Sequence, residues 1–370
     1  MNYIQRFLTE QQKKLQIALV VIALTICVVT YVTVQTGFLH KDHDMMVVKE
    51  QLEGHGIIVS SSSDQIQNAI VEHVVLYSQE QDGSHNKIQR NGVFVRYPDA
   101  VATVLLCHGL MCDKQDEAFL RNLFPRGAYN IMSFDFRAHG ENRKGQFCTL
   151  GKDESYDVIA AGKFIKQHTA VKDLPLYVYG FSMGAVAAIE AQSKEPELFH
   201  AMILDCPFDS SMNVLKRGLE NLKVSLFGYK FDVPGKQLLE KYSFHPYVQS
   251  FVRALLKTIA NLDARDIPLR VPPFSPAISA EKIKIPILFI HCKKDEKVPI
   301  EAVTKVYSSV ASEYKVLWLT NGTKHFGSYF HNPERYTDTV RGFLDLAVAG
   351  DLYITKKSEI IEDQEEHRKV

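Results

Sequence analysis

The chain has 370 residues, of which 46% are hydrophobic and 23% are charged, and its 43 Lys and Arg residues balance 43 Asp and Glu residues. This composition is typical of a globular protein with a large core, and the lack of net charge argues against a nucleic-acid-binding protein. The length allows a single α/β domain with an insertion and a tail. No cysteine lies in a C-x-x-C pair or a zinc-site spacing, so we expect buried free thiols and no metal.

Residues 15–34 form a run of twenty residues without a charged side chain. A helix of this length crosses the roughly 30 Å hydrocarbon core of a bilayer. No small-x-small cleavage site follows the run, which disfavours a cleaved signal peptide. We therefore predict a flank at 1–14, a single transmembrane anchor at 15–34 and a polar linker at 35–65, with a buried core helix or a signal peptide as the alternatives to the anchor. Basic residues before the span place the N-terminus in the cytoplasm and the remaining chain outside, in a periplasm or lumen.

Beyond the linker, residues 66–350 are predicted to form one α/β domain. Two alternating, β-rich stretches within residues 72–98 predict antiparallel strands at the edge of a sheet. Nearly continuous apolar runs, typical of a parallel sheet that is covered on both faces, follow at 101–109, 130–140, 176–182, 201–207, 285–295 and 315–325. Helical patterns lie between these runs, at 154–167 and 183–193 among others, and a last helix is expected within 331–350. This alternation predicts βαβ units.

The alternation is interrupted over residues 209–281, which we interpret as an inserted helical cap. Helical patterns cover 212–226, 236–241 and 247–262, and no strand is apparent. We expect the aromatic residues of this segment either to line an apolar acyl pocket or to pack the cap on the domain; they are Phe227, Tyr229, Phe231, Tyr242, Phe244, Tyr247, Phe251 and Phe274. Residues 351–370 are dense in charge and predict a solvated or disordered tail.

A Gly-x-Ser-x-Gly motif lies where an apolar strand ends and an alanine-rich helix begins, with Ser182 between Gly180 and Gly184. A serine hydroxyl is a weak nucleophile, and a sharp strand-to-helix turn presents it to a base. Glycines two positions before and after the serine allow the backbone to pass close to its neighbours. The start of the following helix offers unpaired N–H groups to an oxyanion. We predict Ser182 as a nucleophile and Met183 N–H as an oxyanion donor.

A second oxyanion donor is expected from the backbone that follows an earlier strand. The strand at 101–109 ends in His108-Gly109, and we predict the N–H of Leu110 for this role. We interpret His108 as a residue that shapes this loop rather than as the base.

The base must be a histidine held by a carboxylate, and both are expected just past the ends of later strands. Asp295 follows one such strand and His325 follows the next, so we predict these two residues to complete a catalytic triad. The competing candidates are Asp205, Asp209 and Glu296 for the acid, and His291 and His331 for the base. This chemistry calls for no cofactor.

Residues from about 70 to 350 resemble the α/β-hydrolase superfamily, and specifically the serine-hydrolase branch similar to monoacylglycerol-lipase and serine-aminopeptidase proteins. The stretches that carry the resemblance, in the family's order, are HGLMCDK, FDFRAHGENRKGQFCTLGKDESYDVIAA, YGFSMGA, ILDCPF, IPILFIHCKKDEKVP and GTKHF. The resemblance implies a central eight-strand, mostly parallel sheet, the triad Ser182, Asp295 and His325, and a lid over the site. Ala138, Asn142 and Cys292 depart from the family's usual residues.

We expect a membrane-anchored serine hydrolase that cleaves carboxylic esters, with small-molecule or lipid acyl substrates such as lysophospholipids or monoacylglycerols. A thioesterase, or an amidase or aminopeptidase with the same triad, is the alternative within this class. A catalytically idle, membrane-tethered binding module is the alternative outside it. The glycosylation motif Asn321-Gly322-Thr323 lies two residues before His325, which argues against a eukaryotic lumen. A bacterial envelope, or a cytosolic domain behind a reversed anchor, avoids this objection.

Overall fold

The computed structural model describes residues 69–80, 85–125, 127–141, 143, 145–220, 223–226, 229–232, 244 and 267–364. The chain divides into a larger unit, residues 47–217 and 267–370, and a smaller one, residues 1–46 and 218–266. The expected flank at 1–14, anchor at 15–34 and linker at 35–65 all lie outside the described residues. Among the described residues, no helix has both the length and the apolar character needed to span a bilayer.

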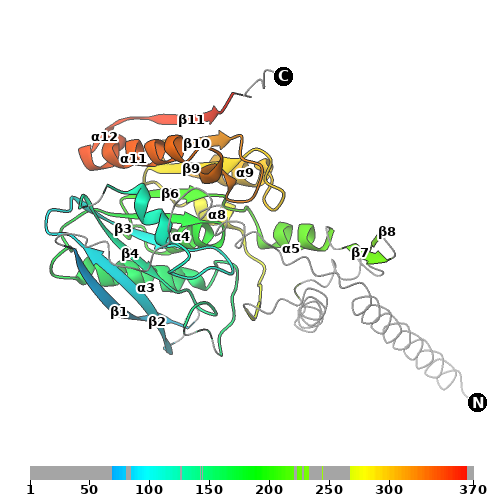
Figure 1. Ribbon diagram of the computed structural model, residues 1–370, viewed down its shortest axis with the longest axis horizontal. Coiled ribbons are helices and arrows are strands. Elements are labelled where there is room, and N and C mark those ends of the chain that lie inside the picture. Colours follow the sequence, from blue (N-terminus) through cyan, green and yellow to red (C-terminus); the bar gives the residue numbers. More distant parts are fainter. Residues whose placement is uncertain are drawn as a thin grey trace, which may run out of the picture. The chain divides into compact units, whose positions relative to one another are not determined.

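A nine-stranded sheet forms the centre of the larger unit, with the order β1-β2-β4-β3-β5-β6-β9-β10-β11 (Figure 1). Its strands are β1 (Ile70–Gln79), β2 (Lys87–Arg96), β3 (Ala102–Cys107), β4 (Tyr129–Phe134), β5 (Leu176–Phe181), β6 (Ala201–Asp205), β9 (Ile287–Cys292), β10 (Tyr314–Thr320) and β11 (Lys357–Glu362). Strand β2 pairs antiparallel with β1 and β4, and all other pairs are parallel. The antiparallel edge and the six apolar strands that the sequence predicts are therefore confirmed.

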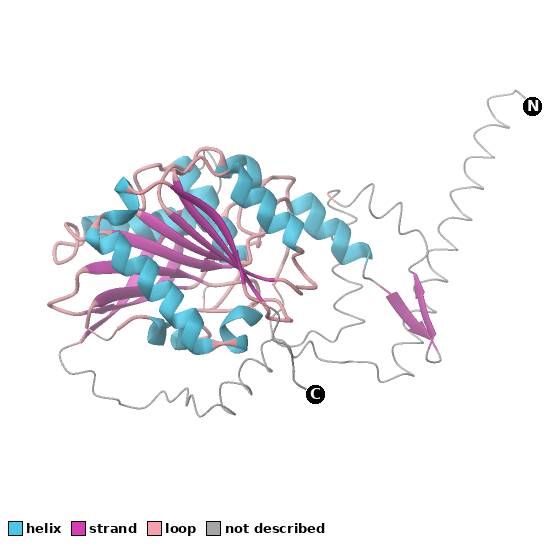
Figure 2. Ribbon diagram, turned by 90° about the horizontal axis from the view of Figure 1, so that it is seen from above, coloured by secondary structure: helices cyan, strands magenta, loops and turns pink. Residues whose placement is uncertain are grey.

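Helices lie on both faces of this sheet (Figure 2). One layer contains α3 (Glu154–Gln167), α4 (Met183–Lys194), α8 (Pro276–Ala280) and α9 (Ile300–Ser309), each in contact with the next. The contacts of η1 (Ala118–Leu123) and α10 (Gly327–His331) with α11 (Pro333–Ala349) define a second group, and α12 (Asp351–Ile354) follows α11. Helix α4 buries ten of its residues, 183–192, because its glycine and alanines leave room for a close approach to the central strands.

The sheet has nine strands, one more than the eight that the resemblance implies. The additional strand is β11, which lies within the expected charged tail. Strand β11 runs parallel to β10, with Leu317 opposite Ile360. It is largely exposed, so its composition carries no apolar run, and backbone pairing with β10 defines it instead. Beyond its end, Asp363 accepts a hydrogen bond from Nε1 of Trp318 at 2.9 Å. Of the two predicted alternatives, the solvated tail is confirmed for these largely exposed residues, and the disordered tail is wrong because they form a strand.

The prediction of a purely helical, strand-free insertion is also wrong where the structure describes it. Helix α5 (Ser211–Glu220) is shorter than the predicted helix at 212–226. It is followed by β7 (Lys223–Leu226) and β8 (Tyr229–Asp232), which pair antiparallel with each other. Apolar and polar residues alternate along both strands, and this period of two favours a hairpin over a helix. The helical patterns at 236–241 and 247–262 lie outside the described residues.

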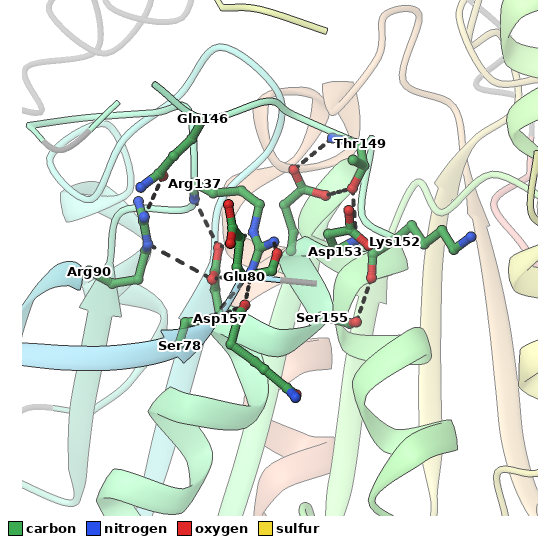
Figure 3. Close-up of polar contacts among 12 residues, drawn as sticks. Ser78, Glu80, Arg90, Arg137, Gln146, Thr149, Lys152, Asp153, Ser155 and Asp157 are labelled. Atoms are coloured by element: carbon green, nitrogen blue, oxygen red, sulfur yellow. Dashed lines mark hydrogen bonds and ion pairs between the residues drawn. The ribbon is translucent and has the colours of Figure 1, made fainter. Parts of the chain in front are cut away.

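A buried polar network ties the antiparallel edge of the sheet to α3 (Figure 3). Arg137, in the loop after β4, donates to both carboxylate oxygens of Asp157, at 2.8 and 3.1 Å. The same guanidinium donates to the backbone carbonyl groups of Gln79 and Glu80 at the end of β1. Burial acts to raise the pKa of Asp157, but the charge and hydrogen bonds of Arg137 hold it below its ordinary value. The loop after β4 is thus fixed to two neighbouring elements.

Candidate active site

Ser182 sits on a sharp turn between β5 and α4. Its backbone has φ 53° and ψ −119°, in a region that side-chain-bearing residues rarely adopt. A Cβ at Gly184 would lie 2.0 Å from the carbonyl oxygen of Cys107, and one at Gly180 would lie 2.8 Å from the amide nitrogen of Ala185. The N–H of Ser182 donates to the backbone carbonyl of Asp205 at 2.8 Å. The two glycines therefore permit the close packing that holds the serine in this strained conformation.

A chain of two hydrogen bonds joins Ser182 to His325 and Asp295. Oγ of Ser182 lies 2.8 Å from Nε2 of His325, and Nδ1 of His325 lies 2.7 Å from Oδ2 of Asp295. The residues come from the ends of β5, β10 and β9, which are parallel strands of one sheet. Because the carboxyl ends of parallel strands meet at one edge, residues 143 positions apart in sequence come into contact. The sequence predicts this grouping, and the structure brings all three residues together.

Both carboxylate oxygens of Asp295 take part in hydrogen bonds. Its Oδ1 accepts hydrogen bonds from the backbone N–H groups of Lys297 and Val298, at 2.8 and 2.9 Å, which leaves Oδ2 directed at His325. Burial acts to raise the pKa of Asp295, but the hydrogen bond and charge of His325 outweigh it, and the pKa is below its ordinary value. The carboxylate is therefore charged at neutral pH and favours a proton on Nδ1 of His325.

The loop that carries His325 packs against the nucleophile turn through aromatic rings. Phe181 precedes Ser182 and Phe326 follows His325, and their ring centroids are 4.5 Å apart. Phe326 has φ 59°, a second strained position beside the site. The imidazole of His325 remains 15% exposed, whereas the Asp295 carboxylate is fully buried. The base is thus accessible from solvent while the acid is shielded.

The competing acids and bases occupy other positions. Asp205 is buried and accepts hydrogen bonds from Tyr336 and Cys206, and burial raises its pKa to about 6. Asp209 accepts from Asn213 and pairs with Lys305. Glu296 is exposed, and His331 ends α10. His291 is fully buried in β9, and burial lowers its pKa to about 4.

The predicted oxyanion donors flank the same turn. Strand β3 pairs with β5, with Cys107 opposite Gly180, so the loop after β3 emerges beside Ser182. A Cβ at Gly109 would lie 2.5 Å from the ring of Phe181, which shows how closely this loop packs on the turn. Within the described part of the chain, neither Leu110 N–H nor Met183 N–H donates a hydrogen bond.

One residue beside the site was not singled out from the sequence. Sγ of Cys206 lies within 4.8 Å of ligand atoms of Asp295 and His325, so these three residues form a set that could hold a metal ion. The thiol donates to Asp205 at 2.8 Å, and burial raises its pKa well above the ordinary value. The expectation of buried free thiols is confirmed for the five cysteines of the described residues, whereas Cys27 lies outside them. The position of Cys206 directly after β6 is the only feature of the sequence that indicates a place near the site.

Comparisons with known proteins agree with this architecture. The model of the alpha/beta hydrolase family matches residues 104–339. The protein YqkD of Bacillus subtilis is 26% identical over 312 residues, which cover 83% of this chain and 89% of that protein. A solved structure of the Pyrococcus furiosus esterase Pf2001 has a TM-score of 0.56 at 22% identity and covers 78% of this chain and 95% of that chain. The acylaminoacyl peptidase of Pyrococcus horikoshii has a TM-score of 0.51 at 14% identity and covers 77% of this chain and 42% of that chain.

At these identities the two solved structures show a shared fold alone. The family model, however, spans more than half of the chain and includes most of the strand before the predicted oxyanion loop, the nucleophile turn and the loop of His325. The chain belongs to the alpha/beta hydrolase family.

Proposed function

We propose that the protein is a serine hydrolase that cleaves carboxylic esters through Ser182, His325 and Asp295. The observation that carries the proposal is the continuous hydrogen-bond chain from Oγ of Ser182 through both ring nitrogens of His325 to Asp295. The strained serine backbone supports the same reaction, as do the N–H groups of Leu110 and Met183, for which the described residues offer no acceptor. The family and the likeness to an esterase are compatible with it.

The reaction proceeds in two steps of acyl transfer. Oγ of Ser182 forms a bond to the substrate carbonyl carbon while Nε2 of His325 takes the hydroxyl proton. The imidazolium is stabilised by Asp295, and the oxyanion is stabilised by Leu110 N–H and Met183 N–H. When the carbon–oxygen bond breaks, His325 returns the proton to the leaving alcohol. Water then attacks the acyl carbon while His325 takes its proton, the bond to Oγ breaks, and His325 returns the proton to Ser182 as the acid product leaves.

The substrate class proposed is a lipid-type acyl ester. The support is the uncharged run at 15–34, which would keep the enzyme at a membrane, and the aromatic residues within 209–281. The same three residues serve thioester and amide cleavage, so a screen over acyl esters, thioesters and aminoacyl amides of matched chain length separates these substrates. Higher kcat/KM for a thioester or amide than for the matched ester would replace the ester assignment.

The anchor and its orientation are part of the proposal. We place the N-terminus in the cytoplasm and the hydrolase domain on the other side of the membrane, on the charge distribution around 15–34. Protease protection of membrane vesicles tests this topology. In sealed, cytoplasm-side-out vesicles the domain should be protected. Its digestion would show that it lies on the cytoplasmic side and that the proposed orientation is wrong.

Labelling with a fluorophosphonate probe tests the catalytic assignment. We expect the wild-type protein to be labelled at Ser182, and the Ser182→Ala variant to lose both labelling and ester hydrolysis. Ser193→Ala, in the last turn of the same helix, serves as a matched control and should retain both. Hydrolysis by Ser182→Ala at the wild-type rate would contradict the proposal.

A further inference from the structure

Two loops at the carboxyl edge of the sheet are connected by a reciprocal pair of histidines. The oxyanion loop, residues 108–114, follows β3, and the β4 loop, residues 135–141, follows β4. Nε2 of His108 accepts the backbone N–H of Phe136 at 3.0 Å, and Nε2 of His139 accepts the backbone N–H of Met111 at 3.2 Å. Each loop thus supplies one imidazole that receives a backbone N–H from the other.

The hydrogen bonds fix the tautomer of both rings. A backbone N–H can only donate, so each Nε2 must carry a lone pair. The remaining nitrogen, Nδ1, then carries the proton and donates to a backbone carbonyl: His108 to Gly109, and His139 to Arg137, both at 2.8 Å. Both imidazoles are at most 1% exposed, and their ring centroids are 5.1 Å apart. Each is a neutral bridge with one accepting and one donating nitrogen.

The bond from His108 to the Gly109 carbonyl acts on a specific peptide group. The C=O of Gly109 and the N–H of Leu110 belong to one planar trans peptide, so they point in opposite directions. The same carbonyl also accepts the N–H of Cys112 at 3.3 Å. Holding the carbonyl on one side therefore directs the N–H of Leu110 to the other.

His139 restrains the next peptide group. It accepts the N–H of Met111, a residue with φ 68°, so the backbone directly after Leu110 is held in a strained conformation. His139 itself follows Ala138, which has φ 60°. Strain on both loops is maintained by the hydrogen bonds between them.

The β4 loop is a rigid support for this arrangement. Arg137, whose carbonyl accepts from His139, is anchored by Asp157 and the end of β1 (Figure 3). At the far end of the oxyanion loop, Lys114 donates to Asp135 from its backbone N–H at 2.9 Å and from Nζ at 2.7 Å. The oxyanion loop is therefore held to the β4 loop at three points along its length.

We infer that His108 and His139 are positioning residues for transition-state stabilisation: through neutral hydrogen bonds they set the orientation of the peptide that presents Leu110 N–H. The inference rests on the proposed function and deepens it, since it assigns the geometry of the oxyanion site to two side chains that do not touch the substrate. Removing an oxyanion donor costs about 10²- to 10³-fold in kcat, and a misdirected donor should cost less, about 10- to 100-fold.

Asparagine and glutamine variants separate positioning from stability. An asparagine amide lies near the position of Nδ1, whereas a glutamine amide lies near the position of Nε2. His108→Asn keeps a donor for Gly109 and should retain most of kcat, whereas His108→Gln should lose about 10- to 100-fold with KM changed less than about twofold. The order reverses at His139, where the Nε2 contact restrains Met111: His139→Gln should retain kcat and His139→Asn should lose it.

His200 provides a matched control. Its Nδ1 accepts the backbone N–H of Leu176 at 3.0 Å, at the end of the sheet opposite to the site. His200→Ala should lower the melting temperature and leave kcat unchanged. Binding of a boronic acid, which forms a tetrahedral adduct at an active serine, should weaken in His108→Gln by the same factor as kcat.

The outcomes distinguish the two proposals. If the wild-type protein is labelled by a fluorophosphonate at Ser182, and kcat falls equally in the Asn and Gln variants or remains at the wild-type value in all four, the positioning role is overturned and the proposed function stands. If kcat falls in step with melting temperature, as a purely structural role requires, the positioning role is again overturned. If the wild-type protein is neither labelled nor active, the proposed function fails and this inference fails with it.

Discussion

The sequence predicts the structure of the turn around Ser182 correctly, whereas it predicts the wrong structure for part of the segment after Asp209. At the turn, a Cβ at Gly180 or Gly184 would lie within 3 Å of backbone atoms, and Ser182 between them has a strained backbone, so local sequence and final geometry agree. After Asp209, helical periodicity predicts a first helix at 212–226, but the structure has a shorter α5 and the hairpin β7–β8. The turn must meet a fixed geometry, so its sequence carries a specific motif, whereas the apolar and polar pattern of 212–226 is compatible with more than one secondary structure.

The largest effect expected from this comparison is at Gly184. A methyl group in Gly184→Ala would overlap the carbonyl oxygen of Cys107, which is part of the central strand β3 and cannot move away. We expect a loss of more than about 4 kcal/mol of unfolding free energy, or failure to fold. Chemical unfolding monitored by circular dichroism measures this loss.

Gly342→Ala is the matched control, because no atom of the described residues outside this stretch of α11 lies within 4 Å of a Cβ at this position. It should be neutral or stabilising by up to about 1 kcal/mol. Equal stability of the two variants would show that the turn at Gly184 is less constrained than its contacts indicate.

An intermediate effect is expected at His291, beside the site. Burial lowers its pKa to about 4, whereas the unfolded chain has an ordinary value near 6.5. Between these values the unfolded state binds more protons, so the stability that neutral His291 permits is complete above about pH 6.5 and is lost as the pH falls toward 4. The loss amounts to about 3 kcal/mol.

Urea unfolding of the wild-type protein and of His291→Gln at pH 4.5, 5.5 and 7 isolates this contribution. The variant should show a flatter dependence on pH, because its amide does not titrate. Parallel curves for the two proteins would mean that other groups cause the acid sensitivity.

The smallest effect is expected in α5, at the start of the insertion. Met212 is 46% exposed, so Met212→Ser should change the unfolding free energy by less than about 0.5 kcal/mol and leave kcat unchanged. A larger change in stability would show that this helix buries Met212 against a partner. The segment after Asp209 would then be more tightly constrained than its exposure indicates.

The parts of the fold that the sequence predicts are those in which burial dictates composition. The apolar strands β3 to β6, β9 and β10 and the helices α3 and α4 were located because both faces of the sheet are covered. Strand β11 was missed because it lies at the edge, where backbone pairing with β10 requires no apolar residues. Charge density alone cannot separate such a strand from a disordered tail.

The candidate site is likewise predictable only where its residues are tied to a recognisable strand. Ser182, His325 and Asp295 were located because each follows a recognisable strand, and parallel strands bring their ends together. The nearness of the Cys206 thiol to Asp295 and His325 depends on loop conformation. The reciprocal bonds of His108 and His139 also depend on ring orientation, and sequence patterns encode neither. The position of His108 directly after β3 indicates a role in shaping its loop, whereas only the structure shows that His139 of the β4 loop is its partner.

The most direct test of the account is the identity of the residue that carries the acyl group during turnover. Rapid quenching of the protein with a short p-nitrophenyl ester, followed by peptide mass analysis, should find one acyl group on Ser182 in the wild-type protein and none in Ser182→Ala. An acyl group on another side chain, such as Cys206, or undiminished turnover by Ser182→Ala, would contradict the account.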